Sequence, residues 1–264
     1  IVPGKGRVSG LRVELLDGET VVASETRANL QTFAGPLTIA KPRLWQPNAP
    51  HLYTARLTLL VRGKDVDTIE RRFGCRGLRA DGTLVRWNGS PLQMRGILHW
   101  GYSPPALAPP NDPLHWRAQI KYFRSLGFNT IKCCLWVPPR GFYELCDELG
   151  MLVWQEYPFD ACKTMVPDTL VVDNSSWIGW QRVTDFWDEH PYGNNSWFPG
   201  RLKEFQKHIA EKGEKPLLLG ECIAADTWVD RDAWLRTHGT QDLWWRPLCW
   251  DAQAGAETWL LEQF

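Results

Sequence analysis

One stretch of the sequence has the residue types for acid–base or nucleophilic chemistry: residues 215–225, which read KPLLLGECIAA. The apolar run 217–219 is typical of a buried parallel strand. Gly220 then removes a side chain where the backbone leaves the sheet, and Glu221 follows at once. A carboxylate at the mouth of a buried strand is costly to desolvate unless it is paired or used. Glu221 is therefore either a catalytic group at the rim of a parallel sheet or a loop residue paired with an Arg.

The composition narrows the class of protein. The 264 residues suffice for one or two domains with a sizeable core. Thirty basic and thirty acidic residues cancel, so nucleic acid is not expected as a partner. There is no run of 18 apolar residues, so no membrane span or membrane partner is expected. No signal peptide is visible, although the sequence starts at Ile1 inside what resembles a domain.

Cysteine and tryptophan are the informative residue types. The seven cysteines are an odd number without zinc-type spacing, which favours buried free thiols over disulfides. We therefore expect a cytoplasmic or periplasmic protein, with a lean toward a reducing compartment. Sixteen tryptophans are unusual for this length. Aromatic faces stack on sugars but also fill cores, so the location of each Trp must decide its role.

Residues 1–80 are expected to form an all-β module. The segment 10–27 alternates apolar and polar residues around an Asp17-Gly18 turn, which predicts a hairpin. A second alternating pair, 52–61 and 66–73, is joined by the turn 62–65. Strands at this spacing indicate an immunoglobulin-like β-sandwich. There are too few of them for a complete one, so we expect it to be truncated at its start.

Residues 84–264 alternate expected strands and helices, which is typical of a parallel α/β fold. The expected strands are 92–98, 129–137, 151–154, 170–172, 183–184, 217–219 and 243–250. The expected helices are 113–126, with Asp112 as its cap and an apolar face of Trp116, Ile120, Tyr122, Phe123 and Leu126, then 142–149 and 199–212. Polar or aromatic residues follow each strand, which favours a barrel whose catalytic groups lie at the carboxyl ends of its strands.

Several phrases in this order resemble glycoside hydrolase family 2, the retaining exo-β-glycosidases that include β-galactosidases, β-glucuronidases and β-mannosidases. Residues 44–53 (LWQPNAPHLY) resemble the end of the family's immunoglobulin-like domain, and 72–76 (RFGCR) the link into its barrel. Residues 87–96 (WNGSPLQMRG) resemble the first barrel strand, and 142–158 (FYELCDELGMLVWQEYP) the second helix and third strand. The resemblance implies a (β/α)8 TIM barrel at 84–264 after the β module.

The resemblance also implies roles for site residues. Glu221 would be the nucleophile at the end of the seventh barrel strand, and Trp250 would end the eighth strand as a platform for the sugar. The remaining pocket residues implied are His99, Trp100, Glu156, Asp173, Asn174, Asp185, His190 and Tyr192. Plainer interpretations are an Asx turn for Asp173 and Asn174, solvated loop charge for Asp188 and Glu189, and a satisfied loop histidine for His190. No metal or cofactor is implied.

The sequence departs from the family pattern at the acid/base. Retaining hydrolysis needs two carboxyl groups about 5–5.5 Å apart. In the family, the second is the Glu of an Asn-Glu pair that ends the fourth strand, and these 264 residues contain no Asn-Glu dipeptide. Residues 159–169 are also too few to hold a helix, a strand and another helix, since a crossover alone needs about 10–12 residues. We therefore expect barrel segments to be absent near 160–166, where the fourth strand would lie, and near 225–243.

The sequence therefore predicts a retaining exo-β-glycosidase that acts on a carbohydrate substrate through a covalent glycosyl-enzyme. One alternative is a non-catalytic carbohydrate-binding relative that has lost its acid/base. Another is an unrelated α/β scaffold protein with tryptophans in its core, which would explain the Trp count but not the ordered phrases. The sequence leaves the sugar, the linkage and homo-oligomer formation open.

Overall fold

The computed structural model describes residues 8–28, 35–102, 108–155, 159–172, 184–190, 198–221, 227–228, 236 and 248–249. The chain divides into two compact units. Unit 1 comprises Ile1–Gly77 and Trp87–Gln155, and unit 2 comprises Leu78–Arg86 and Glu156–Phe264. The expected domains at 1–80 and 84–264, with segments absent near 160–166 and 225–243, stay a prediction.

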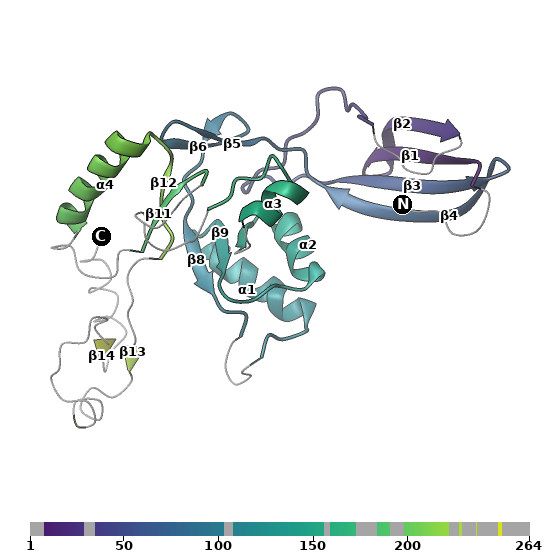
Figure 1. Ribbon diagram of the computed structural model, residues 1–264. Helices are drawn as coiled ribbons and strands as arrows, with labels where there is room; N and C mark the ends of the chain where they lie inside the picture. Colours follow the sequence, from purple (N-terminus) through teal and green to yellow (C-terminus); the bar gives the residue numbers. More distant parts are fainter. Residues whose placement is uncertain are drawn as a thin grey trace. The chain divides into compact units, whose positions relative to one another are not determined.

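The β module of unit 1 is one antiparallel sheet with strand order β2-β1-β3-β4 (Figure 1). Its first hairpin joins β1 (Gly10–Asp17) to β2 (Thr20–Ala28), and its second joins β3 (Tyr53–Val61) to β4 (Lys64–Phe73). Both turns contain a glycine with positive φ, 58° at Gly18 and 74° at Gly63. Glycine adopts this conformation without steric cost, so the two predicted hairpins are confirmed.

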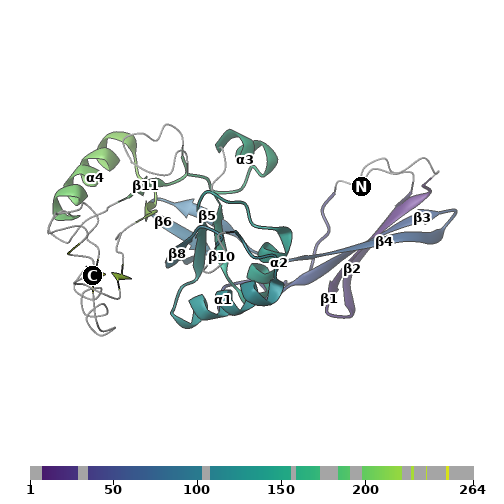
Figure 2. The same cartoon turned by 90° about the horizontal axis from the view of Figure 1, so that it is seen from below.

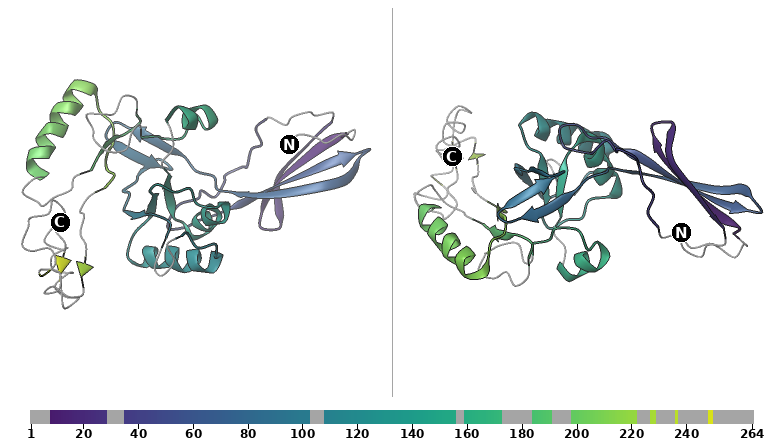
Figure 3. Two further views of the ribbon diagram at one scale, coloured as in Figure 1. Left: turned by 60° about the horizontal axis from the view of Figure 1, so that its bottom comes forward. Right: turned by 90° about the horizontal axis from the view of Figure 1, so that it is seen from above.

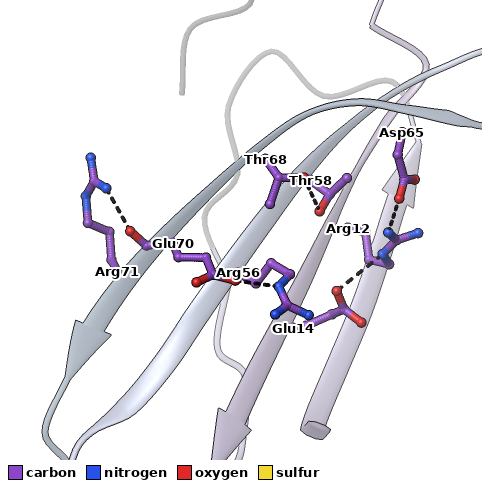
Figure 4. A network of polar contacts seen from close by, with 8 residues as sticks. All are labelled: Arg12, Glu14, Arg56, Thr58, Asp65, Thr68, Glu70 and Arg71. Carbon is purple, nitrogen blue, oxygen red and sulfur yellow. Dashed lines mark hydrogen bonds and ion pairs between the residues drawn. The ribbon is translucent and has the colours of Figure 1, made fainter. Parts of the chain in front are cut away.

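The two faces of this sheet differ because successive side chains of a strand point to opposite sides. Leu11, Val13 and Leu15 are buried on one face. The other face carries ion pairs across strands, which Figure 4 shows: Arg12 Nη2 lies 2.5 Å from Asp65, and Arg56 Nε lies 2.7 Å from Glu70. The described residues of the module form a single sheet, so a complete two-sheet sandwich stays a prediction.

The α/β part of unit 1 is a parallel three-stranded sheet with strand order β10-β9-β8 (Figure 2). After β7 (Ser90–Pro91), the chain runs through β8 (Gly96–His99), α1 (Pro113–Ser125), β9 (Thr130–Cys133), α2 (Arg140–Leu149) and β10 (Leu152–Gln155). The predicted alternation of strand and helix is confirmed here, although β8 and β9 are shorter than the sequence pattern indicates.

The core of this part lies between the sheet and the two helices. Its buried members are Trp116, Ile120 and Phe123 of α1, Ile131 and Cys133 of β9, Phe142, Leu145 and Cys146 of α2, and Met151. Asp112 caps α1 as predicted, because its Oδ1 accepts a hydrogen bond from Leu114 N at 2.9 Å. Tyr122 and Leu126 do not belong to the buried face, since they are 61% and 55% exposed. The helix buries one narrow stripe, and both residues lie outside it.

The β module contacts α2 through the phrase around Trp45. The indole Nε1 of Trp45 donates to the backbone oxygen of Asp147 at 2.7 Å, and Trp87 Nε1 donates to Trp45 O at 3.0 Å. Gly150 ends α2 with φ 74°, and a Cβ there would lie 3.0 Å from the carbonyl carbon of Pro47. The resemblance phrases 44–53 and 142–158 therefore meet at two places, Trp45 with Asp147 and Pro47 with Gly150.

The described residues of unit 2 form short parallel strand pairs and the helices α3 and α4, of which α4 is drawn in green in Figure 3. β5 (Leu78–Asp81) and β6 (Leu84–Trp87) come first in the chain, followed by α3 (Phe159–Met165). β11 (Trp187–Glu189) pairs in parallel with β12 (Leu217–Leu219), and α4 (Phe198–Lys212) connects them. β13 (Thr227–Trp228) pairs in parallel with β14 (Leu248–Cys249).

The expected strands at 170–172 and 183–184 are wrong in position. Residues 170–172 contain no strand, because Val171 N donates to the Asp185 carboxylate at 2.7 Å and Val171 O accepts from Asp185 N at 2.9 Å. Thr184 is not in a strand, position 183 lies outside the described residues, and the strand that follows, β11, starts at Trp187. α3 runs unbroken through Cys162, and the described segment 159–172 contains no strand.

The parallel α/β class is therefore confirmed for the described part of the chain. It contains one three-stranded parallel sheet and two parallel pairs, and closure into a (β/α)8 barrel stays a prediction.

Candidate active site

Glu221 lies at the carboxyl end of a parallel strand, as the sequence predicts. β12 ends at Leu219, and Gly220 N donates to Glu189 O at 3.0 Å. This bond holds the chain after β12 against the end of β11. Because parallel strands present their carboxyl ends at one edge, Glu221 shares that edge with His190. The Glu221 side chain is 19% exposed, so it is largely buried but still partly open to solvent.

His190 lies between two carboxylates. Its Nδ1 is 3.7 Å from Glu221 Oε2, and its Nε2 is 3.5 Å from Asp188 Oδ2. The His190 side chain is 9% exposed and that of Asp188 is fully buried. Asp188 and His190 are two residues apart across the end of β11, and this spacing places both side chains on one face of a strand. The three groups form what we call the Glu221 cluster: Asp188, His190 and Glu221.

Gly220 is required by this packing. A Cβ added there would lie 2.8 Å from Asp188 Oδ2 and 2.9 Å from Asp188 Cγ. Real side chains do not approach a Cβ this closely, so the Asp188 carboxylate occupies the space that a side chain at position 220 would need. The glycine that the sequence suggested as the exit from the strand therefore also makes room for a buried acid.

Glu189 is buried on the opposite face of β11. Its Oε2 accepts from Arg201 Nη2 at 2.8 Å, and Arg201 also pairs with Glu204 and lies over the Phe205 ring at 5.5 Å. Glu189 and Asp188 are both 0% exposed, so the interpretation of these two residues as solvated loop charge is wrong. A buried carboxylate is stable only when paired, and α4 supplies the cation for Glu189.

Asp185 lies at the other end of β11. Its carboxylate accepts a hydrogen bond from Val171 N at 2.7 Å and lies 2.6 Å from Lys163 Nζ. The residue precedes the strand that the sequence expected it to follow, because β11 starts at Trp187. The structure therefore does not bring Asp185 together with the Glu221 cluster, and these contacts anchor the segment before β11.

His99 and Trp100 lie at the end of β8 in unit 1. The His99 ring contacts Trp116, Phe123 and Trp136, with centroids 5.8–5.9 Å apart, and its Nδ1 accepts from Gly101 N at 2.8 Å. This burial lowers the pKa of His99 by disfavouring the imidazolium, while a hydrogen bond with Gln119 opposes the shift. These contacts are those of a core histidine. Trp100 is 47% exposed and presents a face that could stack on a sugar.

Five of the predicted site residues lie outside the described residues: Glu156, Asp173, Asn174, Tyr192 and Trp250. Asp188 was not among the predicted site residues, although its spacing to His190 was a usable signal. Within the described part of the chain, no group of three His, Cys, Asp or Glu side chains could hold a metal ion. Nor does any described helix have the length and hydropathy to cross a membrane.

Comparisons with known proteins agree with the sequence phrases. The family model described as "Glycosyl hydrolases family 2" matches residues 9–76. A putative β-glucuronidase of Formosa agariphila is 32% identical over 171 residues, which cover 62% of this chain and 16% of that protein. A β-glucuronidase of Bacteroides fragilis is 29% identical over 161 residues, 56% of this chain and 22% of that protein. A β-galactosidase of Aeromonas hydrophila is 31% identical over 121 residues, 46% of this chain and 12% of that protein.

Solved structures share the fold at low sequence identity. A β-glucuronidase from Ruminococcus gnavus superposes with a TM-score of 0.72 at 15% identity, covering 93% of this chain and 56% of that one. A Bifidobacterium dentium β-glucuronidase has a TM-score of 0.69 at 18% identity, covering 91% and 54%. The chain thus spans less than a quarter of the three curated relatives and just over half of these two solved chains. The matched segment and the relatives support the resemblance of this chain to family 2 of the glycosyl hydrolases.

Proposed function

We propose that this protein is a retaining exo-β-glycosidase that hydrolyses a terminal β-linked sugar, with Glu221 as its nucleophile. The observation that carries the proposal is the position of Glu221, at the carboxyl end of β12 and beside the end of β11. Catalytic groups of parallel α/β barrels lie at this edge. A partly exposed carboxylate on a buried, hydrogen-bonded base suits a nucleophile that must reach substrate yet stay fixed.

In the proposed reaction, a Glu221 oxygen attacks the anomeric carbon as the bond to the leaving-group oxygen breaks. The leaving group takes the electron pair of that bond and a proton from an acid/base carboxyl, and a glycosyl ester forms on Glu221. Water then attacks the anomeric carbon and gives its proton to the same acid/base. The bond to the Glu221 oxygen breaks and returns its electron pair to the carboxylate, which releases the sugar with retained configuration. The acid/base is not identified among these 264 residues, since the Asn-Glu pair is absent.

The remaining site assignments are parts of the same proposal. Trp100 and Trp250 would stack on the terminal sugar, while Glu156, Asp173, Asn174 and Tyr192 would bond its hydroxyl groups. The exposed face of Trp100 supports its part. These groups belong to one pocket only if the parallel strands close into a (β/α)8 barrel. Closure of this barrel is therefore part of the proposal.

The names of the relatives direct the choice of sugar. The two relatives named β-glucuronidase and the one named β-galactosidase make β-glucuronides and β-galactosides the first substrates to test, followed by β-mannosides.

The test is trapping of the covalent intermediate. The 264-residue protein is incubated with 2,4-dinitrophenyl 2-deoxy-2-fluoro-β-glycosides of these sugars, whose activated leaving group departs without a proton. Intact mass should show one added fluoroglycosyl group, and peptide mapping should place it on Glu221. E221Q is the matched control and should gain no mass. An adduct on another residue, or none with any sugar, would contradict the proposal.

A second candidate function is carbohydrate binding without turnover. The observation that favours it is again the absence of an Asn-Glu pair from the sequence. In that case, sugars should bind in a calorimetric titration, while the activated fluoroglycosides add no mass. An adduct on Glu221 would exclude this candidate.

A further inference from the structure

Two carboxylates face the two nitrogens of one imidazole at the end of β11. Nδ1 of His190 faces Glu221 Oε2 at 3.7 Å, and Nε2 faces Asp188 Oδ2 at 3.5 Å. We propose that His190 is a positioning residue that holds the carboxylate of Glu221, and that Asp188 holds the imidazole in turn. The inference rests on the proposed role of Glu221 as nucleophile.

The burial of the three groups decreases toward the substrate side. Asp188 is 0% exposed, the His190 side chain 9% and the Glu221 side chain 19%. A buried carboxylate next to an imidazole favours one orientation of the ring, because rotating the ring would lose the attraction between Asp188 and His190 in a low-dielectric surrounding. The distances are longer than those of formed hydrogen bonds. Catalytic hydrogen bonds are often long without substrate and shorten when it binds.

Two nearby cations have other partners near β11. On the opposite face of β11, Glu189 is engaged by Arg201 of α4 at 2.8 Å. Lys215, before β12, donates to Thr184 O and lies 4.7 Å over the Trp187 ring, at the entry end of the strand pair. His190 faces the Glu221 carboxylate from the end of β11, at 3.7 Å from Nδ1 to Oε2.

The geometry also distinguishes the two oxygens of Glu221. Oε2 faces the imidazole, so an N–H from Nδ1 would hold that oxygen and leave Oε1 to attack the anomeric carbon. In the trapped intermediate, the ester bond forms through Oε1, while Oε2 becomes the ester carbonyl and keeps the hydrogen bond. The fluoroglycoside contributes the leaving phenolate, which takes the electron pair of the broken bond. The role of His190 is thus to fix the angle of attack rather than to transfer a proton.

The first test measures trapping kinetics. We compare the rate constant and the half-saturating concentration for inactivation by the activated fluoroglycoside in wild type, H190Q, H190F and D188N. H190F should lower the rate constant about 10- to 100-fold with little change in half-saturation, as expected for one lost hydrogen bond to a charged group. H190Q keeps a donor and should recover part of the rate. H208Q is the control, because His208 belongs to α4, where its ring contacts Trp187, and is not part of the Glu221 cluster.

The second test does not depend on activity. The imidazole nitrogens of ¹⁵N-histidine-labelled protein are observed by NMR, and H190Q assigns the His190 pair among the six histidines. E221Q should move mainly the Nδ1 resonance, and D188N mainly the Nε2 resonance. If E221Q moves neither, His190 does not contact Glu221 and the inference is overturned, whatever the kinetics show.

The two tests separate this inference from the proposed function. Normal trapping in wild type with an unchanged rate constant in H190F would overturn the positioning role and leave the nucleophile intact. No trapping in wild type would overturn the proposed function and, with it, the role of His190 in that reaction. The NMR experiment would then still report whether the three side chains form the arrangement described.

Discussion

The carboxylate of Asp188 occupies the space above the Cα of Gly220 that any other residue would fill with its side chain. A Cβ at position 220 would lie 2.8 Å from Asp188 Oδ2. Gly220 also donates its N–H to Glu189 O at 3.0 Å, so its backbone cannot move away freely. One glycine therefore links the burial of Asp188 to the position of Glu221, the next residue in the chain.

We expect G220A to destabilise the protein by about 1–3 kcal/mol, because the added methyl group overpacks a fixed polar neighbour. The same change should slow trapping of Glu221 by displacing its backbone. G200A is the matched control: Gly200 lies in α4 with open space around its Cα, and alanine should raise stability by up to about 1 kcal/mol. Urea unfolding measures both. Equal effects of the two substitutions would contradict the packing described.

Arg201 should be more important to stability than a surface arginine. R201M leaves Glu189 buried without this cation, and we expect the free energy of unfolding to fall by roughly 2–4 kcal/mol. This loss is smaller than for a completely buried pair, because the Arg201 side chain is 21% exposed. The double variant E189M/R201M should recover most of the loss, since it removes the buried charge as well. Urea unfolding of the two single variants and the double variant completes the cycle; additive losses would show that the pair is not coupled.

The burial of His99 predicts a pH dependence of stability. Its pKa in the folded protein is lowered by burial, so below the ordinary value of about 6.5 the unfolded chain binds a proton that the folded chain does not. The free energy of unfolding should therefore fall as pH drops from about 6.5 to the lower pKa of the folded state. Above about pH 6.5, this group should contribute no slope. H99Q should lack this part of the slope in urea unfolding between pH 5 and 8. An identical slope in H99Q would contradict the burial.

Gly150 and Gly127 provide a matched test of the contact between the β module and α2. Each follows a helix with positive φ, 74° and 90°, so alanine at either site should cost about 1–2 kcal/mol in backbone strain. Only G150A also meets the Pro47 backbone, whereas nothing lies within 4 Å of the Cβ position at Gly127. We expect G150A to cost at least about 1 kcal/mol more than G127A in urea unfolding. A similar cost at both sites would show that the Pro47 contact adds nothing.

Local sequence signals predicted the elements that depend on local interactions. The Asp17-Gly18 turn gives the first hairpin, Asp112 caps α1, and Gly150 ends α2 in a left-handed conformation. In each case, the residue type itself satisfies the backbone requirement. Glu221 was predicted for the same reason, since a short apolar run, a glycine and an acid follow one another in the chain.

The features that the sequence did not predict depend on pairing between distant residues. β11 starts at Trp187 because Trp187 pairs with Leu217, and nothing near 183–184 reveals that register. The surroundings of His99 follow from its pairing with Cys133 and from the packing of α1, which enclose the ring in aromatic side chains. Asp188 is buried because Gly220 leaves room for it. None of these partners can be read from the local pattern.

The contact between Trp45 and Asp147 joins residues 102 positions apart. At a synthesis rate of about 5–20 residues per second, Trp45 leaves the peptidyl-transferase centre roughly 5–20 s before its hydrogen-bond acceptor exists. β1 and β2 precede Trp45 in the chain, and β3 and β4 are made within that interval, so all four strands exist before Asp147. During that interval the indole N–H of Trp45 has no Asp147 to bond, so the contact with α2 can form only after all four strands of the β module have been synthesised.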